Sequence, residues 1–178
     1  MSTLMRLGWW MLLLSLACSA FMGCSSTPKM GQYTFVVSPD ESLRSGGSMV
    51  SFEVDIVGVT ELDKPTWEAQ NVDDYFSPRN ARRANATRHT MSFSNQQPQP
   101  QTLRYDAQVW NTWRNQGAMH VVLLASIPGS GVTSTGGDTR RLVLPLSTAR
   151  WNDRQQINIV VKSDGVQCVS AMKPEKVK

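Results

Sequence analysis

The stretch Val50-Ser51-Phe52-Glu53-Val54-Asp55-Ile56 alternates apolar and polar side chains and is the clearest strand signal in the chain. A period of two places Phe52, Val54 and Ile56 on one face of a strand and the polar side chains on the other. We therefore expect a strand here with one buried face and one wet face.

Strand signals recur through much of the remaining chain. They lie at Tyr33–Val37, His89–Phe93, Ala118–Ala125, Arg141–Leu146, Gln156–Lys162 and Val166–Ala171. The turn Ser45-Gly46-Gly47-Ser48 would let the first strand pair with the Val50 strand or lie close to it, and Asp164-Gly165 predicts a hairpin between the last two strands. Because Val121–Leu124 is continuously apolar, we expect that strand to be central and buried on both faces.

Two helical segments are expected between the strands. The first lies in Thr60–Phe76, with Asp63 as its N-cap. The second spans Leu103–Gln116 and is followed by Gly117, where a helix C-terminal glycine is expected. Residues 78–88 are expected to form a connection rich in Arg and Asn.

About seven short strands separated by turn signals predict a mostly β fold, an antiparallel β-sandwich with one or two short helical insertions. The alternative is a single sheet with helices on one face, and the hydrophobic pattern does not separate the two. Within this architecture, residues 32–172 are expected to form the sandwich domain and residues 173–178 a charged tail.

The N-terminal segment has the pattern of a secretory signal followed by a lipidation site. Residues 1–23 contain one positive charge, Arg6, and an apolar run that is too short and too interrupted for a permanent membrane span. Phe21-Met22-Gly23-Cys24 resembles the bacterial lipobox, in which a signal peptidase cuts before an acylated cysteine. Ser15-Leu16-Ala17-Cys18 is a competing site, and an ordinary cleaved signal is the other alternative.

Acylation of Cys24 implies a membrane anchor. A bacterial lipoprotein carries several acyl chains, palmitate among them, and more than one chain is needed for stable attachment. Residues 24–31 are polar and turn-forming and would serve as a short tether. By resemblance to other lipoproteins, Ser25 implies sorting to the outer membrane, so that the folded domain faces the periplasm.

The charge balance argues against nucleic acid as a partner. Removing residues 1–23 of the 178 leaves 155 residues, enough for one domain, with 17 basic and 14 acidic side chains. Basic residues cluster at Arg79, Arg82, Arg83 and Arg88, but no aromatic residue lies between them to stack on bases. A solvated loop explains this cluster better than a nucleic-acid site.

The residue types needed for catalysis do not converge in the sequence. His89 and His120 lie in separate predicted strands without a Cys, His or carboxylate at metal-ligand spacing. Gly129-Ser130-Gly131 lacks the lysine and the strand-to-helix setting of a phosphate loop. Asp73 and Asp74 are typical of a solvated helix face. We therefore expect no enzyme activity, cofactor or metal.

Aromatic side chains concentrate in or next to the helical segments. Large aromatic residues bury much area and are enriched at the centres of protein interfaces. One interpretation is that they seal the helices onto the sheet, and the other is that some of them form a docking surface with the arginine-rich connection. The candidate partner-binding residues are Trp67, Tyr75, Phe76, Arg79, Arg82 and Arg83.

The layout resembles the outer-membrane lipoproteins of type VI secretion systems. The resemblance lies in Cys24 and its lipobox, the Val50–Val59 strand after a polar turn, the helix near Trp67–Phe76, the Val121–Ala125 strand and the Ile157–Cys168 hairpin. It implies a transthyretin-like β-sandwich, lipid-anchored in the outer membrane, that binds the periplasmic part of an inner-membrane protein. The alternative is a ligand-binding or envelope-maintenance lipoprotein with an apolar cavity between its sheets.

The lipobox assignment predicts the behaviour of Cys24→Ala. This substitution removes the acylated thiol, so we expect membrane attachment to be abolished while the domain stays folded. Fractionation of cells into membrane and soluble protein measures the outcome, with circular dichroism as the control for folding. Cys24→Ala protein that stays in the membrane fraction would refute the assignment.

Overall fold

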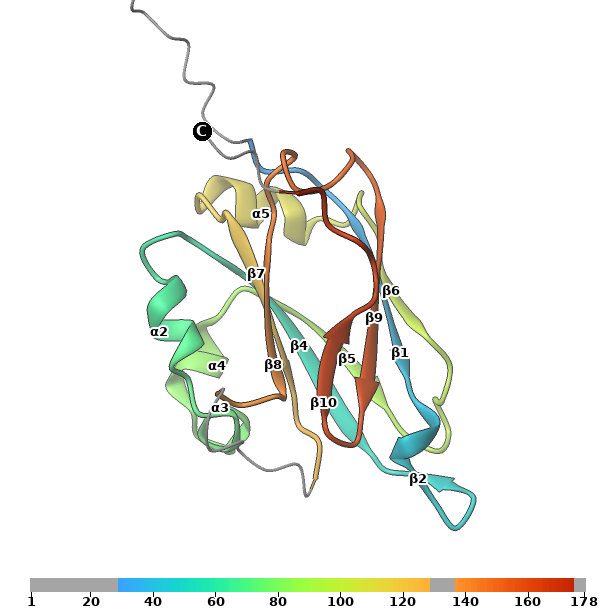
Figure 1. Ribbon diagram of the computed structural model, residues 1–178. Coiled ribbons are helices and arrows are strands. Elements are labelled where there is room, and N and C mark those ends of the chain that lie inside the picture. The colour runs from blue at the N-terminus through green and yellow to red at the C-terminus, as the bar shows by residue number, and fades with distance from the viewer. Residues whose placement is uncertain (1–28, 129–136, 175–178) are drawn as a thin grey trace, which may run out of the picture.

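Two four-stranded sheets pack face to face in the computed structural model, which describes residues 29–128 and 137–174 (Figure 1). The first sheet has the order β10-β9-β1-β6 and consists of β1 (Thr34–Pro39), β6 (Gln101–Leu103), β9 (Gln156–Lys162) and β10 (Gly165–Cys168). The second has the order β5-β4-β7-β8 and consists of β4 (Phe52–Val59), β5 (Arg88–Phe93), β7 (His120–Ala125) and β8 (Arg141–Pro145). The predicted β-sandwich is confirmed.

One strand pair departs from the antiparallel pattern. Strands β1 and β9 run parallel, with Phe35 opposite Ile157, whereas every pair of the second sheet is antiparallel. The strands β1 and β9 are far apart in the sequence, so no local turn sets their direction. The long-range pairing therefore could not be anticipated from turn signals.

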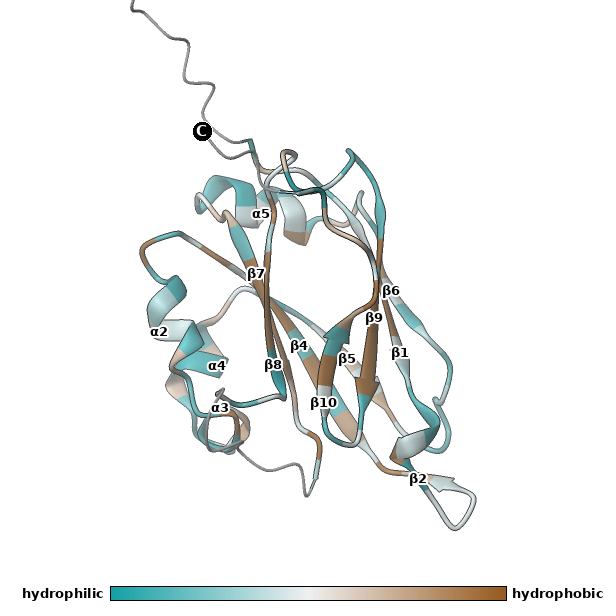
Figure 2. Cartoon of the chain, in the orientation of Figure 1, coloured by the Kyte–Doolittle hydropathy of each residue, from teal (hydrophilic) through white to brown (hydrophobic). Residues whose placement is uncertain are grey.

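Apolar side chains from both sheets fill the space between them, and several of them are aromatic rings in contact with one another. Helix α5 (Val109–Asn115) contributes Trp110 and Trp113, whose rings meet edge to face at 5.0 Å, and Trp110 stacks on Phe35 at 5.9 Å. Trp113 lies directly against Gly58, where a Cβ atom would come within 2.3 Å of the indole. Figure 2 shows the apolar colouring along β4, β7 and β9.

Three short helices, here called the helical cap, cover the outer face of the second sheet (Figure 1). They are α2 (Lys64–Glu68), α3 (Val72–Phe76) and α4 (Ala81–Asn85). Together with the sheet, they bury a second apolar cluster of Val57, Val59, Val72, Tyr75, Val122 and Leu124. This confirms that β7 is buried on both faces, and it corrects the expected wet face of β4.

The helical segments are shorter than the sequence pattern predicts. The expected helix within Thr60–Phe76 is divided into α2 and α3, and Asp63 stands at the start of α2 without capping a backbone N–H. The expected connection 78–88 contains α4, because Asn80 caps it by accepting a hydrogen bond from the Arg83 backbone N–H at 2.8 Å. Each helix is too short to be stable without the sheet beneath it.

Two turns and one helix end also differ from expectation. Leu103 belongs to β6 rather than to a helix, and α5 starts only at Val109. The Ser45–Ser48 turn joins the small strands β2 (Arg44–Ser45) and β3 (Ser48–Met49), which follow a 3-10 helix at Glu41–Leu43, and β1 and β4 lie in different sheets. The β9–β10 hairpin turns at Ser163-Asp164, one residue earlier than predicted.

Residues 1–28, which contain the predicted signal and Cys24, lie outside the described part of the chain, as does most of the glycine-rich stretch near Gly129. Among the described residues, no helix is long and apolar enough to cross a membrane.

The contact between Gly58 and Trp113 predicts a cost for Gly58→Ala. The added methyl group displaces the indole, so we expect the free energy of unfolding to fall by about 2 kcal/mol. Urea denaturation followed by circular dichroism measures this cost. In a Trp113→Leu background, the same substitution should cost much less, and equal costs in the two backgrounds would contradict this account of the packing.

Candidate partner-binding surface

The carboxylate of Asp55 is fully buried beneath the helical cap. Its Oδ2 atom accepts hydrogen bonds from Arg83 Nε at 2.8 Å and from the Tyr75 hydroxyl at 3.0 Å. Its Oδ1 atom accepts from Thr90 Oγ1 at 2.6 Å, across the β4–β5 pair. Arg88 Nε lies 3.4 Å from Oδ2 and adds a second positive charge. One carboxylate thus joins β4, β5, α3 and the α4 arginine.

Arg83 is the centre of this network. Its Nη2 atom lies 2.6 Å from Glu53 Oε2 on β4, and its backbone carbonyl accepts a hydrogen bond from Arg88. Burial opposes its charge, but hydrogen bonds to Asp55 and Glu53 raise the pKa of the guanidinium, which stays charged. Burial, together with the charge of Asp55, raises the pKa of Tyr75, so its hydroxyl stays a donor.

A second arginine, Arg140, is buried and joins α3 to the segment before β8. Its Nη1 and Nη2 atoms bind both carboxylate oxygens of Asp73 at 2.6 and 3.0 Å. Its Nε and Nη2 atoms bind Asp138 at 2.9 and 2.7 Å. The Asp73 side chain is 73% exposed, in accord with a solvated helix face, yet it also forms this bidentate pair. Two arginine networks therefore hold the cap on the sheet.

We define the cap surface as the four candidate residues that do not join the Asp55 network, Trp67, Phe76, Arg79 and Arg82; Trp67 and Phe76 also pack against the apolar cluster beneath the helices. The Arg82 guanidinium lies 5.4 Å from the centroid of the Trp67 ring and also donates a hydrogen bond to the Thr66 carbonyl at 3.2 Å. Phe76 is half-buried, and Arg79 is exposed. Aromatic and arginine side chains of this kind are enriched where proteins bind one another.

The six predicted partner-binding residues divide into two groups. Tyr75 has no exposed surface, and Arg83 binds the carboxylates of Asp55 and Glu53, so both residues attach the cap to the sheet. The other four form the cap surface. The sequence did not indicate Asp55 as the residue that binds Tyr75 and Arg83, although it occupies a polar position opposite Thr90 in the sheet.

The other tryptophans in the described part of the chain belong to the core. Trp110, Trp113 and Trp151 are fully buried. Each donates its indole N–H to a backbone carbonyl, of Arg104, Thr87 and Pro145 respectively, at 2.7–2.8 Å. The interpretation that aromatic residues attach helices to the sheet therefore holds for Trp110 and Trp113 of α5, whereas Trp151 lies outside the helices.

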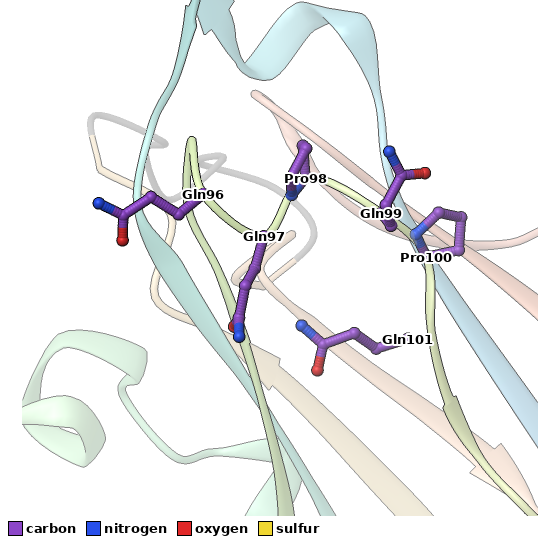
Figure 3. Close-up of a pocket in the computed structure, with 6 residues that line it drawn as sticks. All are labelled: Gln96, Gln97, Pro98, Gln99, Pro100 and Gln101. Carbon is purple, nitrogen blue, oxygen red and sulfur yellow. The ribbon is translucent and has the colours of Figure 1, made fainter.

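The histidines, the acidic side chains and a surface hollow are further features that bear on chemistry. His89 and His120 lie in different strands, β5 and β7. No group of three or more His, Cys, Asp or Glu side chains among the described residues is arranged to hold a metal ion. A hollow of about 330 Å³ is lined by Gln96, Gln97, Pro98, Gln99, Pro100 and Gln101 (Figure 3). Its lining contains no charged side chain.

No protein-family model matches the chain, and no curated protein matches its sequence. A solved structure described as the type VI membrane complex aligns at a TM-score of 0.52 and 12% identity, covering 80% of this chain and 100% of that chain. The protein has the fold of a type VI membrane-complex component. The layout resemblance drawn from the sequence is thus confirmed at the level of the fold.

Two further solved structures are similar. A structure described as the C-terminal domain of the T6SS protein TssM, from EAEC, aligns at a TM-score of 0.53 with 14% identity, covering 77% of this chain and 99% of that chain. The T6SS lipoprotein TssJ1 from Pseudomonas aeruginosa aligns at 0.49 with 10% identity, covering 83% and 99%.

The buried network predicts a large stability cost for Asp55→Asn. Removing this charge leaves Arg83 and Arg88 without their shared partner, so we expect the free energy of unfolding to fall by about 3 kcal/mol. Chemical denaturation of the variant and of Asp106→Asn measures the difference. Asp106 pairs with Arg104 at an exposed site, so that variant should keep the denaturation midpoint. A similar midpoint for both variants would contradict the role of Asp55.

The Arg140 network predicts an acid dependence of stability. Burial acts to raise the pKa of Asp138, but the hydrogen bonds from Arg140 outweigh it and hold that pKa below its usual value; hydrogen bonds from Arg140 also lower the pKa of Asp73. The stabilisation from these two ion pairs is present above the unfolded-state pKa of the carboxylates. It is lost as pH falls through their folded-state pKa, below about pH 4. Denaturation across this range should therefore show a shallower loss of stability for Arg140→Gln than for the unchanged protein, and parallel profiles would contradict this.

Proposed function

We propose that this protein is an outer-membrane lipoprotein whose periplasmic β-sandwich anchors a multiprotein envelope assembly of the type VI secretion kind. Acylated Cys24 holds it to the membrane through the tether of residues 24–31. The helical cap binds the periplasmic part of an inner-membrane protein through the cap surface. The protein acts as a structural connector between the two membranes, without catalysis or a cofactor.

The observation that carries this proposal is the fold. A chain of the type VI membrane complex has the same architecture over its whole length. The space between the sheets also favours an assembly role over the ligand-binding alternative, because residues such as Phe35, Ile56, Leu123 and Ile159 are fully buried there, side chain against side chain.

The cap is well suited to docking because the residues that attach it to the sheet differ from those proposed to contact the partner. Asp55 and Arg140 fix the helices through buried charge-assisted hydrogen bonds, which have strict geometry. Trp67 and Arg82 are held against each other on the outside. A pre-ordered surface loses little side-chain entropy when a partner binds. The residues on this surface are therefore ready for binding without rearrangement.

The docking proposal is tested by Trp67→Ala and Arg82→Glu in the full-length protein. We expect each variant to stay folded in the membrane fraction and to lose at least tenfold of its co-purified inner-membrane partner, identified by mass spectrometry after crosslinking in cells. A loss of that size corresponds to about 1.4 kcal/mol or more, as expected for an interface hot spot.

Arg114→Glu is the matched control. Arg114 is an exposed arginine on α5, outside the cap, so its reversal changes the net charge by the same amount as Arg82→Glu. Partner recovery should be unchanged for this variant. Equal recovery from Arg82→Glu and from the unchanged protein, with both folded, would exclude the cap surface as the docking site.

A further inference from the structure

Both ends of the described chain meet at one end of the sandwich (Figure 1). The Lys29 carbonyl accepts a hydrogen bond from the Thr148 backbone N–H at 3.0 Å. The Lys173 backbone N–H donates to the Arg150 carbonyl at 2.8 Å, and its Nζ donates to the Trp151 carbonyl at 2.8 Å. We call this surface the tether end; it consists of residues 29–31, 147–155 and 169–174.

The tether sets how far this end can lie from the membrane. Residues 29–31 of the tether are hydrogen-bonded or bridged to the domain. Four residues, Ser25 to Pro28, separate Cys24 from Lys29, so a fully extended chain spans about 18 Å between these two residues. The eight-residue strand β4 alone is about 27 Å long. If Cys24 is acylated, as the proposed function holds, the domain cannot turn its opposite end to the membrane.

The tether end is basic. It carries Lys29, Arg150, Arg154 and Lys173 against a single acidic residue, Asp153. The rest of the chain from Cys24 onward is balanced, with 13 basic and 13 acidic residues. The net positive charge of the mature chain is therefore concentrated at the tether end. Clustered basic residues close to a bilayer are attracted by anionic headgroups.

Apolar side chains are exposed at the same place. Val169 is 58% and Met172 is 41% exposed, and they are two of the three large hydrophobic residues found exposed among those described. Met172 lies beside Arg150, whose Nη2 atom is 3.8 Å from the Met172 sulfur. Apolar side chains next to basic groups are typical of surfaces that lie in the headgroup region of a membrane.

We propose that the tether end rests directly on the membrane surface, with its basic residues on anionic phospholipid headgroups and Met172 in the interface. The acyl anchor and this surface then act as two attachments, which fix the orientation of the sandwich. The end with β2 and β3 points away from the bilayer. This inference rests on the proposed lipidation of Cys24, and it concerns a surface separate from the helical cap.

The orientation is tested with the full-length lipidated protein in vesicles. In a Cys168→Ala background, a fluorophore is attached at Met172→Cys or, as the matched control at the opposite end, at Ser45→Cys. The vesicles contain phosphatidylcholine with or without phosphatidylglycerol, together with a nitroxide-labelled headgroup as quencher. We expect strong quenching at position 172, increased by phosphatidylglycerol, and little at position 45. Lys29→Gln should weaken the contact about fivefold, since each basic group near such a surface contributes about 1 kcal/mol.

The outcomes separate this inference from the proposed anchor. Protein that does not float with the vesicles would refute the anchor itself. Protein that floats, but shows equal quenching at positions 45 and 172 or no response to phosphatidylglycerol, would overturn the orientation while leaving the anchor intact. A label at position 172 that is shielded in the native envelope but unquenched in vesicles would assign this end to a protein partner and would also overturn the proposal.

Discussion

The charge of Asp55, buried between the second sheet and the helical cap, is the constraint on which the outer half of this molecule depends. An ionised carboxylate out of water is costly unless it is paired and hydrogen-bonded. Asp55 meets this requirement with Arg83, Arg88, Tyr75 and Thr90. These partners come from α3, α4 and β5, so satisfying one charge fixes the placement of three elements. The helices themselves are too short to supply that order.

The second network complements the first. Arg140 ties Asp73 of α3 to Asp138 at the other edge of the sheet. The cap is thus held at β5 by one set of charges and near β8 by another, with an apolar cluster around Val72 and Tyr75 between them. Directional bonds at both edges and burial in the middle give a rigid layer. The outer residues of that layer are consequently pre-ordered for contact.

The sequence predicted the sandwich because local patterns determine most of it. The alternation of Phe52, Val54 and Ile56 and the apolar run Val121–Leu124 each reflect the strand's own period. The pattern did not separate a wet face of β4 from a face covered by helices, because Asp55 is polar in either case. Only the long-range approach of Arg83 shows that this position is buried.

The sequence predicted which residues make up the candidate site, but not which of them point inward to the sheet. Trp67, Phe76 and the arginines stood out as a group, while the inward role of Tyr75 depends on contact with β4 twenty residues away. Likewise, Leu103 fitted a helical stripe but lies in β6, where pairing with Phe35 of β1 outweighs its local helical context. Tertiary contacts decided these positions, and such contacts leave little local signal.

The central claim, that the cap surface binds the periplasmic part of an inner-membrane protein, is tested most directly by photo-crosslinking in living cells. A photoreactive amino acid replaces Arg82 in one strain and Arg114 in another, both in the otherwise native lipoprotein. The account predicts that position 82 crosslinks to one inner-membrane protein with a periplasmic region and that position 114 does not. Crosslinks to such a protein from position 114 alone, with the position 82 protein folded and equally abundant, would contradict it.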